Sequence, residues 1–261
     1  MRILLALCLA YLVGLVCGMP AAMPFDYLGN LGFTPMREDL RVPADGRRRV
    51  VVLQHGILRS SFALGRLERA LRDHGYEVHN LDYPSTMATL DAHADRLAAA
   101  VASLQIRSGA DDISFVGHSM GGLVIEEYLR RPGAVKPAAC VYIATPHRGA
   151  ILADLRKHWF LYGLIMGTKA AGELSPGDAF HRRPIPYLER TGLIVGDIGD
   201  GNASIPGPDD GTVAVGEASL PGVASVTLPF GHTRIAFDPV TAVQVLTFLR
   251  HGRFEAVATD H

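Results

Sequence analysis

The hexapeptide Gly-His-Ser-Met-Gly-Gly at positions 117–122 constrains the fold of this chain more than any other stretch. It lies between an apolar run typical of a strand, residues 113–116, and a run with helical spacing, residues 120–131. A Gly-x-Ser-x-Gly sequence at a strand-to-helix junction is typical of a nucleophile elbow, a sharp turn that exposes a serine hydroxyl. The flanking glycines permit the close backbone approach that such a turn needs. The pattern therefore predicts that Ser119 is a nucleophile at a helix N-terminus, where negative charge is favoured.

Strand-like and helix-like segments alternate through most of the chain. The predicted strands are residues 50–53, 76–81, 112–116, 139–144, 192–195 and 224–228, and the predicted helices are 61–73, 89–107, 120–131 and 240–250. The strands are apolar throughout, as expected of strands buried on both faces. This order predicts an α/β fold with a mostly parallel central sheet of about six strands and helices on both faces. Ligands of such sheets bind beyond the carboxyl ends of the strands.

The chain length of 261 residues fits one domain, which we expect over residues 23–261. Residues 150–190 break the alternation of strands and helices. This stretch begins with an apolar part that includes Trp159 to Met166, and it ends in a proline-rich part. We expect a small cap-like insertion packed over the site.

The first 22 residues differ from the rest. Arg2 is followed by an apolar run that is short for a membrane span, which favours a secretory signal peptide. The sequence therefore predicts export to the periplasm or the medium, with an uncleaved N-terminal membrane anchor as the alternative. If the leader is removed after Cys17, Cys140 is the remaining cysteine and no intrachain disulfide can form.

A serine nucleophile needs a base and a carboxylate that orients the base. In folds with a nucleophile elbow these residues follow the serine in the order acid, then histidine. His232 lies between the last predicted strand and the last predicted helix, where the base is expected. Asp210, in a loop after the penultimate strand, is the preferred acid, with Asp209 and then Asp197 as alternatives.

The loops at the carboxyl ends of the strands also offer donors and substrate contacts. The oxyanion hole is predicted to use the backbone N–H groups of Met120 and Ile57. His55, Leu58 and His147 are candidates for substrate binding, although the two histidines also fit structural roles.

Composition argues against several other functions. The net charge of −1 gives no electrostatic footprint for nucleic acid. There is no zinc-ligand pattern and no phosphate-binding glycine loop, and the acidic residues between 197 and 209 do not have the spacing of a calcium loop. The sequence therefore predicts no metal and no cofactor.

Taken in order, these motifs resemble the α/β-hydrolase superfamily, and within it bacterial lipase- and esterase-like proteins. The resemblance covers roughly residues 48–251 and rests on residues 54–56, 117–122, 145–149, 210–213 and His232. It implies hydrolysis of a small-molecule or lipid ester through an acyl-enzyme without a cofactor, with Ser119 as nucleophile, Asp210 as acid and His232 as base. Met120 and Ile57 would supply the oxyanion donors.

The sequence departs from this family in two respects. The usual N-terminal antiparallel strands are not evident before Val50, so we expect a small sheet, and the insertion is short for a mobile lipase lid. The same residues suit a thioesterase, an amidase or an acyltransferase. The alternative from a different functional class is a non-catalytic accessory or binding protein on a hydrolase scaffold.

Overall fold

The protein is built around one parallel sheet. The structure is a computed structural model that describes residues 32–156, 172–198 and 201–257. The sheet has the strand order β2-β1-β3-β4-β5-β6, and every neighbouring pair is parallel. Its strands are β1 (Arg49–Gln54), β2 (Glu77–Leu81), β3 (Asp112–His118), β4 (Cys140–Ile143), β5 (Thr191–Gly196) and β6 (Ala224–Leu228). The predicted parallel sheet of about six strands is confirmed.

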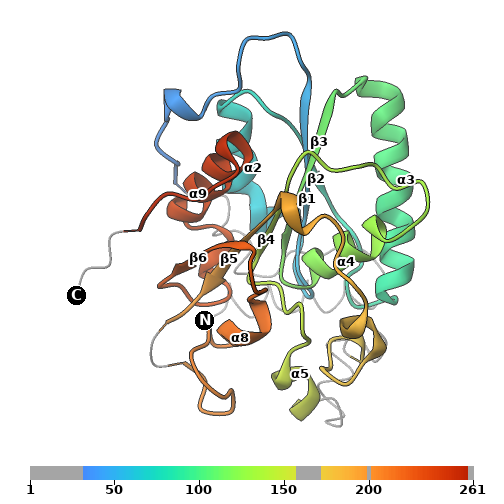
Figure 1. Cartoon of the computed structure of the whole chain (residues 1–261), viewed down its shortest axis with the longest axis vertical. Coiled ribbons are helices and arrows are strands. Elements are labelled where there is room, and N and C mark those ends of the chain that lie inside the picture. The colour runs from blue at the N-terminus through green and yellow to red at the C-terminus, as the bar shows by residue number, and fades with distance from the viewer. Residues whose placement is uncertain (1–31, 157–171, 199–200, 258–261) are drawn as a thin grey trace, which may run out of the picture.

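Helices cover both faces of this sheet (Figure 1), as predicted. One face carries α3 (Leu90–Ser108) and α4 (Met120–Leu129), and the other carries α2 (Gly65–Asp73) and α9 (Pro239–His251). The shorter helices α5 (Ile151–Arg156) and α8 (Val215–Ala218) lie beyond the carboxyl end of the sheet. Single turns of 3-10 helix occur at Glu38–Leu40, Ser61–Leu64, Ala179–Arg182, Leu188–Arg190 and Arg234–Ala236.

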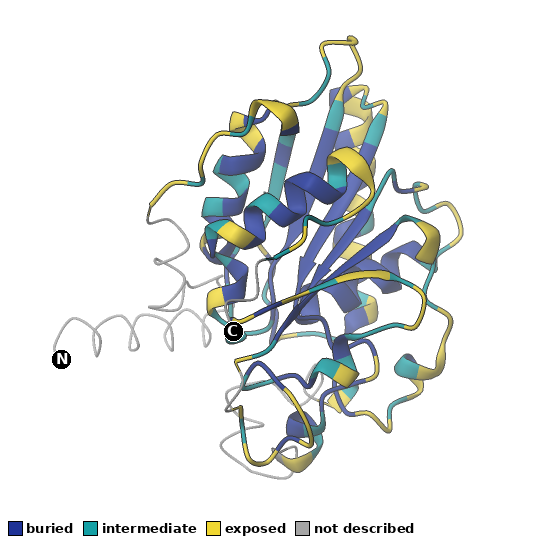
Figure 2. Ribbon diagram, turned by 60° about the vertical axis from the view of Figure 1, so that its left-hand side comes forward, coloured by how far each residue is buried: buried dark blue, intermediate teal, exposed yellow. Residues whose placement is uncertain are grey.

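The alternation of side chains along β1 explains why the sheet needs cover on both sides. Val50 and Val52 belong to the core beneath α3 and α4, whereas Val51 and Leu53 belong to the core beneath α2 and α9. Successive side chains of a strand point to opposite faces, so an apolar run fills two cores at once. Figure 2 shows the central strands buried along almost their whole length.

Two sequence-based expectations fall partly or wholly outside the described residues. The predicted signal peptide or anchor at residues 1–22 lies outside them, as does the apolar stretch around Trp159. The described parts of the predicted insertion hold α5 and the two 3-10 turns Ala179–Arg182 and Leu188–Arg190. No helix within the described ranges is both long enough and apolar enough to pass through a membrane.

The junction of β3 and α4 is very crowded. A Cβ atom on Gly121 would lie 2.2 Å from the carbonyl oxygen of Gln54 in β1, and one on Gly117 would lie 2.6 Å from the Cα of Gly122. Ser119, between them, has φ 54° and ψ −130°, a conformation that non-glycine residues rarely adopt. The glycines are therefore required because the helix begins against the backbone of the neighbouring strand.

Gly121→Ala should lower the free energy of unfolding by about 3 kcal/mol or more, because the new methyl group meets backbone atoms that cannot move aside. Gly216→Ala in α8 is the matched control, since its Cβ would meet no atom within 4 Å. Urea unfolding followed by circular dichroism measures both. Equal stability of the two variants would contradict the proposed crowding.

Candidate active site

Ser119 lies at the carboxyl end of β3, near the centre of the sheet. Its N–H donates to the carbonyl of Ile143 in β4 at 2.9 Å, which fixes the turn between the two strands. The side chain is largely buried but lines a pocket. The positive φ of Ser119 is the kind of backbone strain that persists only where the surrounding structure imposes it.

His232 contacts Ser119 from the loop that follows β6. Its Nε2 lies 2.9 Å from Ser119 Oγ, and its Nδ1 lies 2.7 Å from Asp210 Oδ2. The carboxylate accepts from Nδ1–H, which leaves Nε2 bare and able to accept the serine proton. The N–H of His232 also donates to the carbonyl of Asp210 at 2.8 Å, so two contacts join these residues.

The structure distinguishes between the candidate carboxylates. The second oxygen of Asp210, Oδ1, accepts from the N–H groups of Thr212 at 2.9 Å and Val213 at 2.7 Å. The Asp209 carboxylate instead accepts from the N–H groups of Asn202 and Gly211 and so closes its own loop. Asp210 is thus the carboxylate that contacts His232, and it is oriented by backbone donors on its other side.

The loop after β1 approaches the serine closely. A Cβ on Gly56 would lie 2.9 Å from the Cβ of Ser119, so the backbone passes directly over Ser119. Ile57 and Leu58 follow and line the pocket. Met120 is the first residue of α4, so its N–H has no acceptor within the helix. Both predicted oxyanion donors therefore belong to residues next to Ser119 in the chain or in space.

The predicted substrate-binding histidines are buried outside the pocket lining. His55 donates from Nδ1 to the carbonyl of Gly56 at 2.9 Å, and its ring packs on Tyr83 with a centroid distance of 4.4 Å. His147 pairs through Nδ1 with Glu126 Oε1 at 2.5 Å. These contacts suit the structural roles that the sequence also allowed, and they give no direct contact with the pocket.

His118, expected to point away from the serine, in fact lines the pocket. Its Nε2–H donates to the backbone carbonyl of His232 at 3.0 Å. Burial, aided by the charges of His232 and Arg59, holds the pKa of His118 well below its usual value. His118 is therefore neutral and supports the main chain of His232. The one signal for this role in the sequence is that His118 is adjacent to Ser119.

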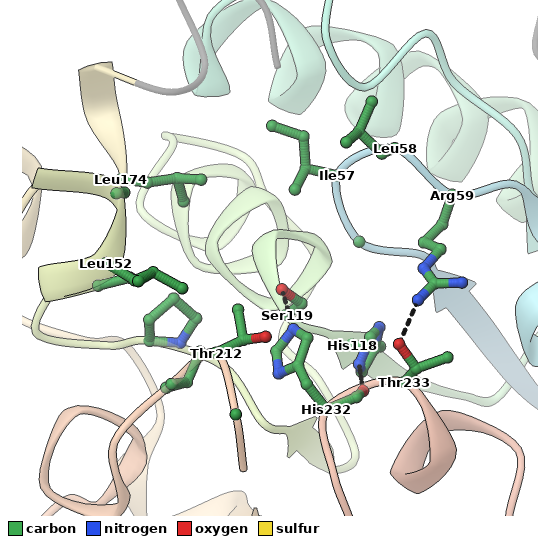
Figure 3. A pocket seen from close by; sticks show the side chains of 16 residues that line it. Ile57, Leu58, Arg59, His118, Ser119, Leu152, Leu174, Thr212, His232 and Thr233 are labelled. Atoms are coloured by element: carbon green, nitrogen blue, oxygen red, sulfur yellow. Dashed lines mark hydrogen bonds between the residues drawn. The ribbon is translucent and has the colours of Figure 1, made fainter. Parts of the chain in front are cut away.

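The pocket beside Ser119 has a volume of about 390 Å³. Figure 3 shows Ser119 and His232 at its centre, with a dashed line between them. Most of the lining is apolar, and it includes Ile57, Leu58, Pro146, Ala150, Leu152, Ala153, Leu174 and Val213. Arg59, Thr212 and Thr233 add polar groups. Sequence reasoning missed them because a motif marks a loop without showing which of its side chains face the pocket. The described residues contain no cluster of His, Cys, Asp and Glu that could hold a metal ion.

The sequence matches the model of the alpha/beta hydrolase family over residues 50–257. No curated protein matches it. Among solved structures, the mature lipase BlEst2 of Bacillus licheniformis is similar with a TM-score of 0.64 and 20% identity, over 80% of this chain and 94% of that one.

Two further solved structures share the fold. The metagenomic carboxyl esterase MGS0156 has a TM-score of 0.60 and 18% identity, over 80% of this chain and 76% of that one. The type II thioesterase BorB from the borrelidin biosynthetic cluster has a TM-score of 0.54 and 17% identity, over 84% of this chain and 100% of that one. At these identities the likeness concerns the fold. Since the family model spans most of the sequence, this chain belongs to the alpha/beta hydrolase family.

Proposed function

We propose that this protein is a serine hydrolase that cleaves carboxylic esters, of the esterase or lipase type, through an acyl-enzyme. The observation that carries the proposal is the hydrogen-bonded chain from Asp210 through His232 to Ser119, which ends in a largely apolar pocket. A serine hydroxyl held at 2.9 Å from an imidazole nitrogen has the base that it needs for attack. An accessory protein would have no use for this arrangement.

The proposed reaction begins when Ser119 Oγ attacks the ester carbonyl and its proton passes to His232 Nε2. The N–H groups of Met120 and Ile57 stabilise the oxyanion of the tetrahedral intermediate. His232 then gives its proton to the leaving alcohol, and Asp210 stabilises the imidazolium throughout. A water molecule, deprotonated by His232, repeats the attack on the acyl-enzyme and releases the acid.

The apolar lining supports an apolar acyl group. Leu152 and Leu174 come from segments on either side of residues 157–171, and both line the pocket with Ile57. Burying methylene groups against such side chains gains roughly 0.8 kcal/mol each. The expected export, or the alternative membrane anchoring through residues 1–22, would bring the enzyme to esters outside the cytoplasm or at a membrane surface.

Ser119→Ala should lower kcat for p-nitrophenyl esters by at least about 10⁴-fold, because it removes the hydroxyl on which the proposed acyl-enzyme forms. In the wild type, kcat/KM should rise with acyl length until the pocket is filled. Ser114→Ala, on β3 and away from the pocket, is the matched control and should stay active. Full activity of Ser119→Ala would exclude it as nucleophile, and indifference to acyl length would exclude the apolar acyl site.

Asp210→Asn should lower kcat roughly 10⁴-fold, because an amide in that place favours the wrong tautomer of His232. Asp209→Asn is the comparison variant. It changes the neighbouring carboxylate, which contacts backbone N–H groups and not His232, so its kcat should fall far less. Steady-state kinetics with one p-nitrophenyl ester measures both. A larger loss from Asp209→Asn would reverse the assignment.

The activity should rise with pH along a limb that reports the loss of one proton, because only the neutral imidazole of His232 can act as base. The loss of a proton from His118 should not contribute to this rise, because its lowered pKa keeps His118 neutral around pH 6.5, where an ordinary histidine titrates. A pH profile of kcat/KM tests this expectation. If the logarithm of kcat/KM rose with a slope of two against pH, a second group would also have to lose a proton before reaction.

Thioester hydrolysis, amide hydrolysis and acyl transfer use the same residues. Parallel assays with an ester, a thioester and an anilide of the same acid separate the first two from esterase activity. Added alcohol reveals acyl transfer if a new ester forms. Esterase activity predicts that the oxygen ester gives the highest kcat/KM and that water captures the acyl group.

A further inference from the structure

Thr212 places a hydroxyl group in the apolar part of the pocket beside Ser119. In Figure 3, Leu152 and Leu174 lie on one side of Ser119, and Thr212 lies between Ser119 and Leu152 with its oxygen turned towards His232. We refer to the end of the pocket that Leu152 and Leu174 line as the acyl end. A polar group therefore stands where the acyl end meets the proposed nucleophile.

This hydroxyl differs from the other two side-chain hydroxyls that line the pocket. The hydroxyl of Ser119 contacts His232 Nε2 at 2.9 Å, and that of Thr233 accepts from the Nη2–H of Arg59 at 2.6 Å. The hydroxyl of Thr212 has no hydrogen-bond partner among the residues that the structure describes. It is therefore available to a substrate, as a donor and as an acceptor.

The turn that carries Thr212 is held by both neighbouring carboxylates. The backbone N–H groups of Thr212 and Val213 donate to Asp210 Oδ1 at 2.9 Å and 2.7 Å, and that of Gly211 donates to Asp209 Oδ1 at 2.6 Å. A β-branched side chain such as threonine also has few rotamers open to it. The same carboxylate that orients the proposed base thus fixes the backbone of Thr212, and the hydroxyl is positioned before a substrate binds.

The proposed reaction decides which part of an ester passes Thr212. The acyl carbon must lie at Ser119 Oγ, and the leaving oxygen must lie at His232 Nε2, which returns the proton to it. The acyl chain then extends from Ser119 into the acyl end. Because Thr212 lies between Ser119 and Leu152, the first carbons of the acyl chain pass its hydroxyl.

A plain alkyl chain in this position would have an unfavourable contact. It would remove water from the Thr212 hydroxyl and offer no hydrogen bond in return, and an unsatisfied polar group costs free energy when it is covered. A hydroxyl group on the chain would replace the lost water, because two hydroxyls can donate to and accept from each other. A pocket that is apolar apart from a few well-placed polar groups selects ligands through those groups.

We infer that the site selects esters of hydroxy acids, in which carbon 2 or carbon 3 of an otherwise apolar chain carries a hydroxyl group that Thr212 binds. This inference rests on the proposed function and names its substrate class. In the reaction the bond between the acyl carbon and the alcohol oxygen breaks. Water supplies the hydroxyl group of the released carboxylic acid, and its other proton goes to the alcohol oxygen. The hydroxyl on the chain forms no covalent bond and leaves unchanged.

The test uses the methyl esters of hexanoic, 2-hydroxyhexanoic, 3-hydroxyhexanoic and 3-methylhexanoic acid, with both enantiomers of each substituted acid. The 3-methyl ester matches the bulk of the 3-hydroxy ester without its polar group. Titration of the released acid gives kcat/KM for each ester with the wild type, Thr212→Val and Thr212→Ser. Comparing the same ester between proteins removes differences in intrinsic ester reactivity. Thr227→Val on β6 is the matched control, because it removes the same hydroxyl from an exposed residue outside the pocket.

For Thr212→Val, the ratio of kcat/KM for the preferred hydroxy ester to that for methyl hexanoate should fall about fivefold or more, as expected for a lost hydrogen bond. The value for methyl hexanoate itself should stay level or rise, because valine adds apolar surface to the acyl end. Thr212→Ser should recover the ratio, since it keeps the hydroxyl, and Thr227→Val should leave the ratio at its wild-type value. The better of the two hydroxy esters identifies the carbon whose hydroxyl Thr212 binds.

Other outcomes overturn the inference. If Thr212→Val lowers kcat/KM for all the esters equally, Thr212 only supports the turn next to Asp210. If the wild type cleaves the 3-methyl ester as well as the hydroxy esters, or if its preference for hydroxy esters survives in Thr212→Val, the inference fails while the proposed esterase function stands. A wild type that is inactive on every ester, with Ser119 unlabelled by a fluorophosphonate, would refute the proposed function and the inference together.

Discussion

The start of α4 against the end of β1 is the contact on which the rest of the site depends. Gly121 lies so close to the carbonyl of Gln54 that no side chain fits between them. This approach draws Ser119 into its strained conformation and brings the loop at Gly56 over it. The same contact thus determines where Ser119 and the two residues proposed as oxyanion donors, Met120 and Ile57, lie. Backbone contacts as close as these leave no room for movement. This suits a site whose groups must be held within a fraction of an ångström of their working positions.

The remaining parts of the site come from the strands at the β6 edge of the sheet. β5 lies next to β4 and β6 lies next to β5, and the loops that follow β5 and β6 carry Asp210 and His232. Asp210 and His232 each have a further contact that limits their movement. Backbone donors orient the Asp210 carboxylate, while His118 holds the backbone carbonyl of His232. The hydrogen-bond chain is therefore supported at three points, and it needs little rearrangement before the proposed reaction.

The sequence predicted the layers of the fold and the order of the main motifs because both depend on short-range patterns. Apolar strands of the right length and a glycine pair around Ser119 are visible without coordinates. The contributions of His118 and Arg59 could not be seen this way, since each depends on a contact made across more than a hundred residues. The choice between Asp209 and Asp210 also needed the structure, because adjacent residues in a loop can point in opposite directions. His55 and His147 lie in motifs but turn into the interior, where Tyr83 and Glu126 meet them.

The central claim is that Ser119 is an activated nucleophile, and covalent labelling tests it most directly. A fluorophosphonate reacts with a serine only when a neighbouring base removes the hydroxyl proton during attack. The account predicts one adduct per chain, located on the peptide that contains Ser119, and much slower labelling when His232 is replaced by alanine. An unlabelled Ser119 in folded protein, or labelling that does not depend on His232, would contradict it.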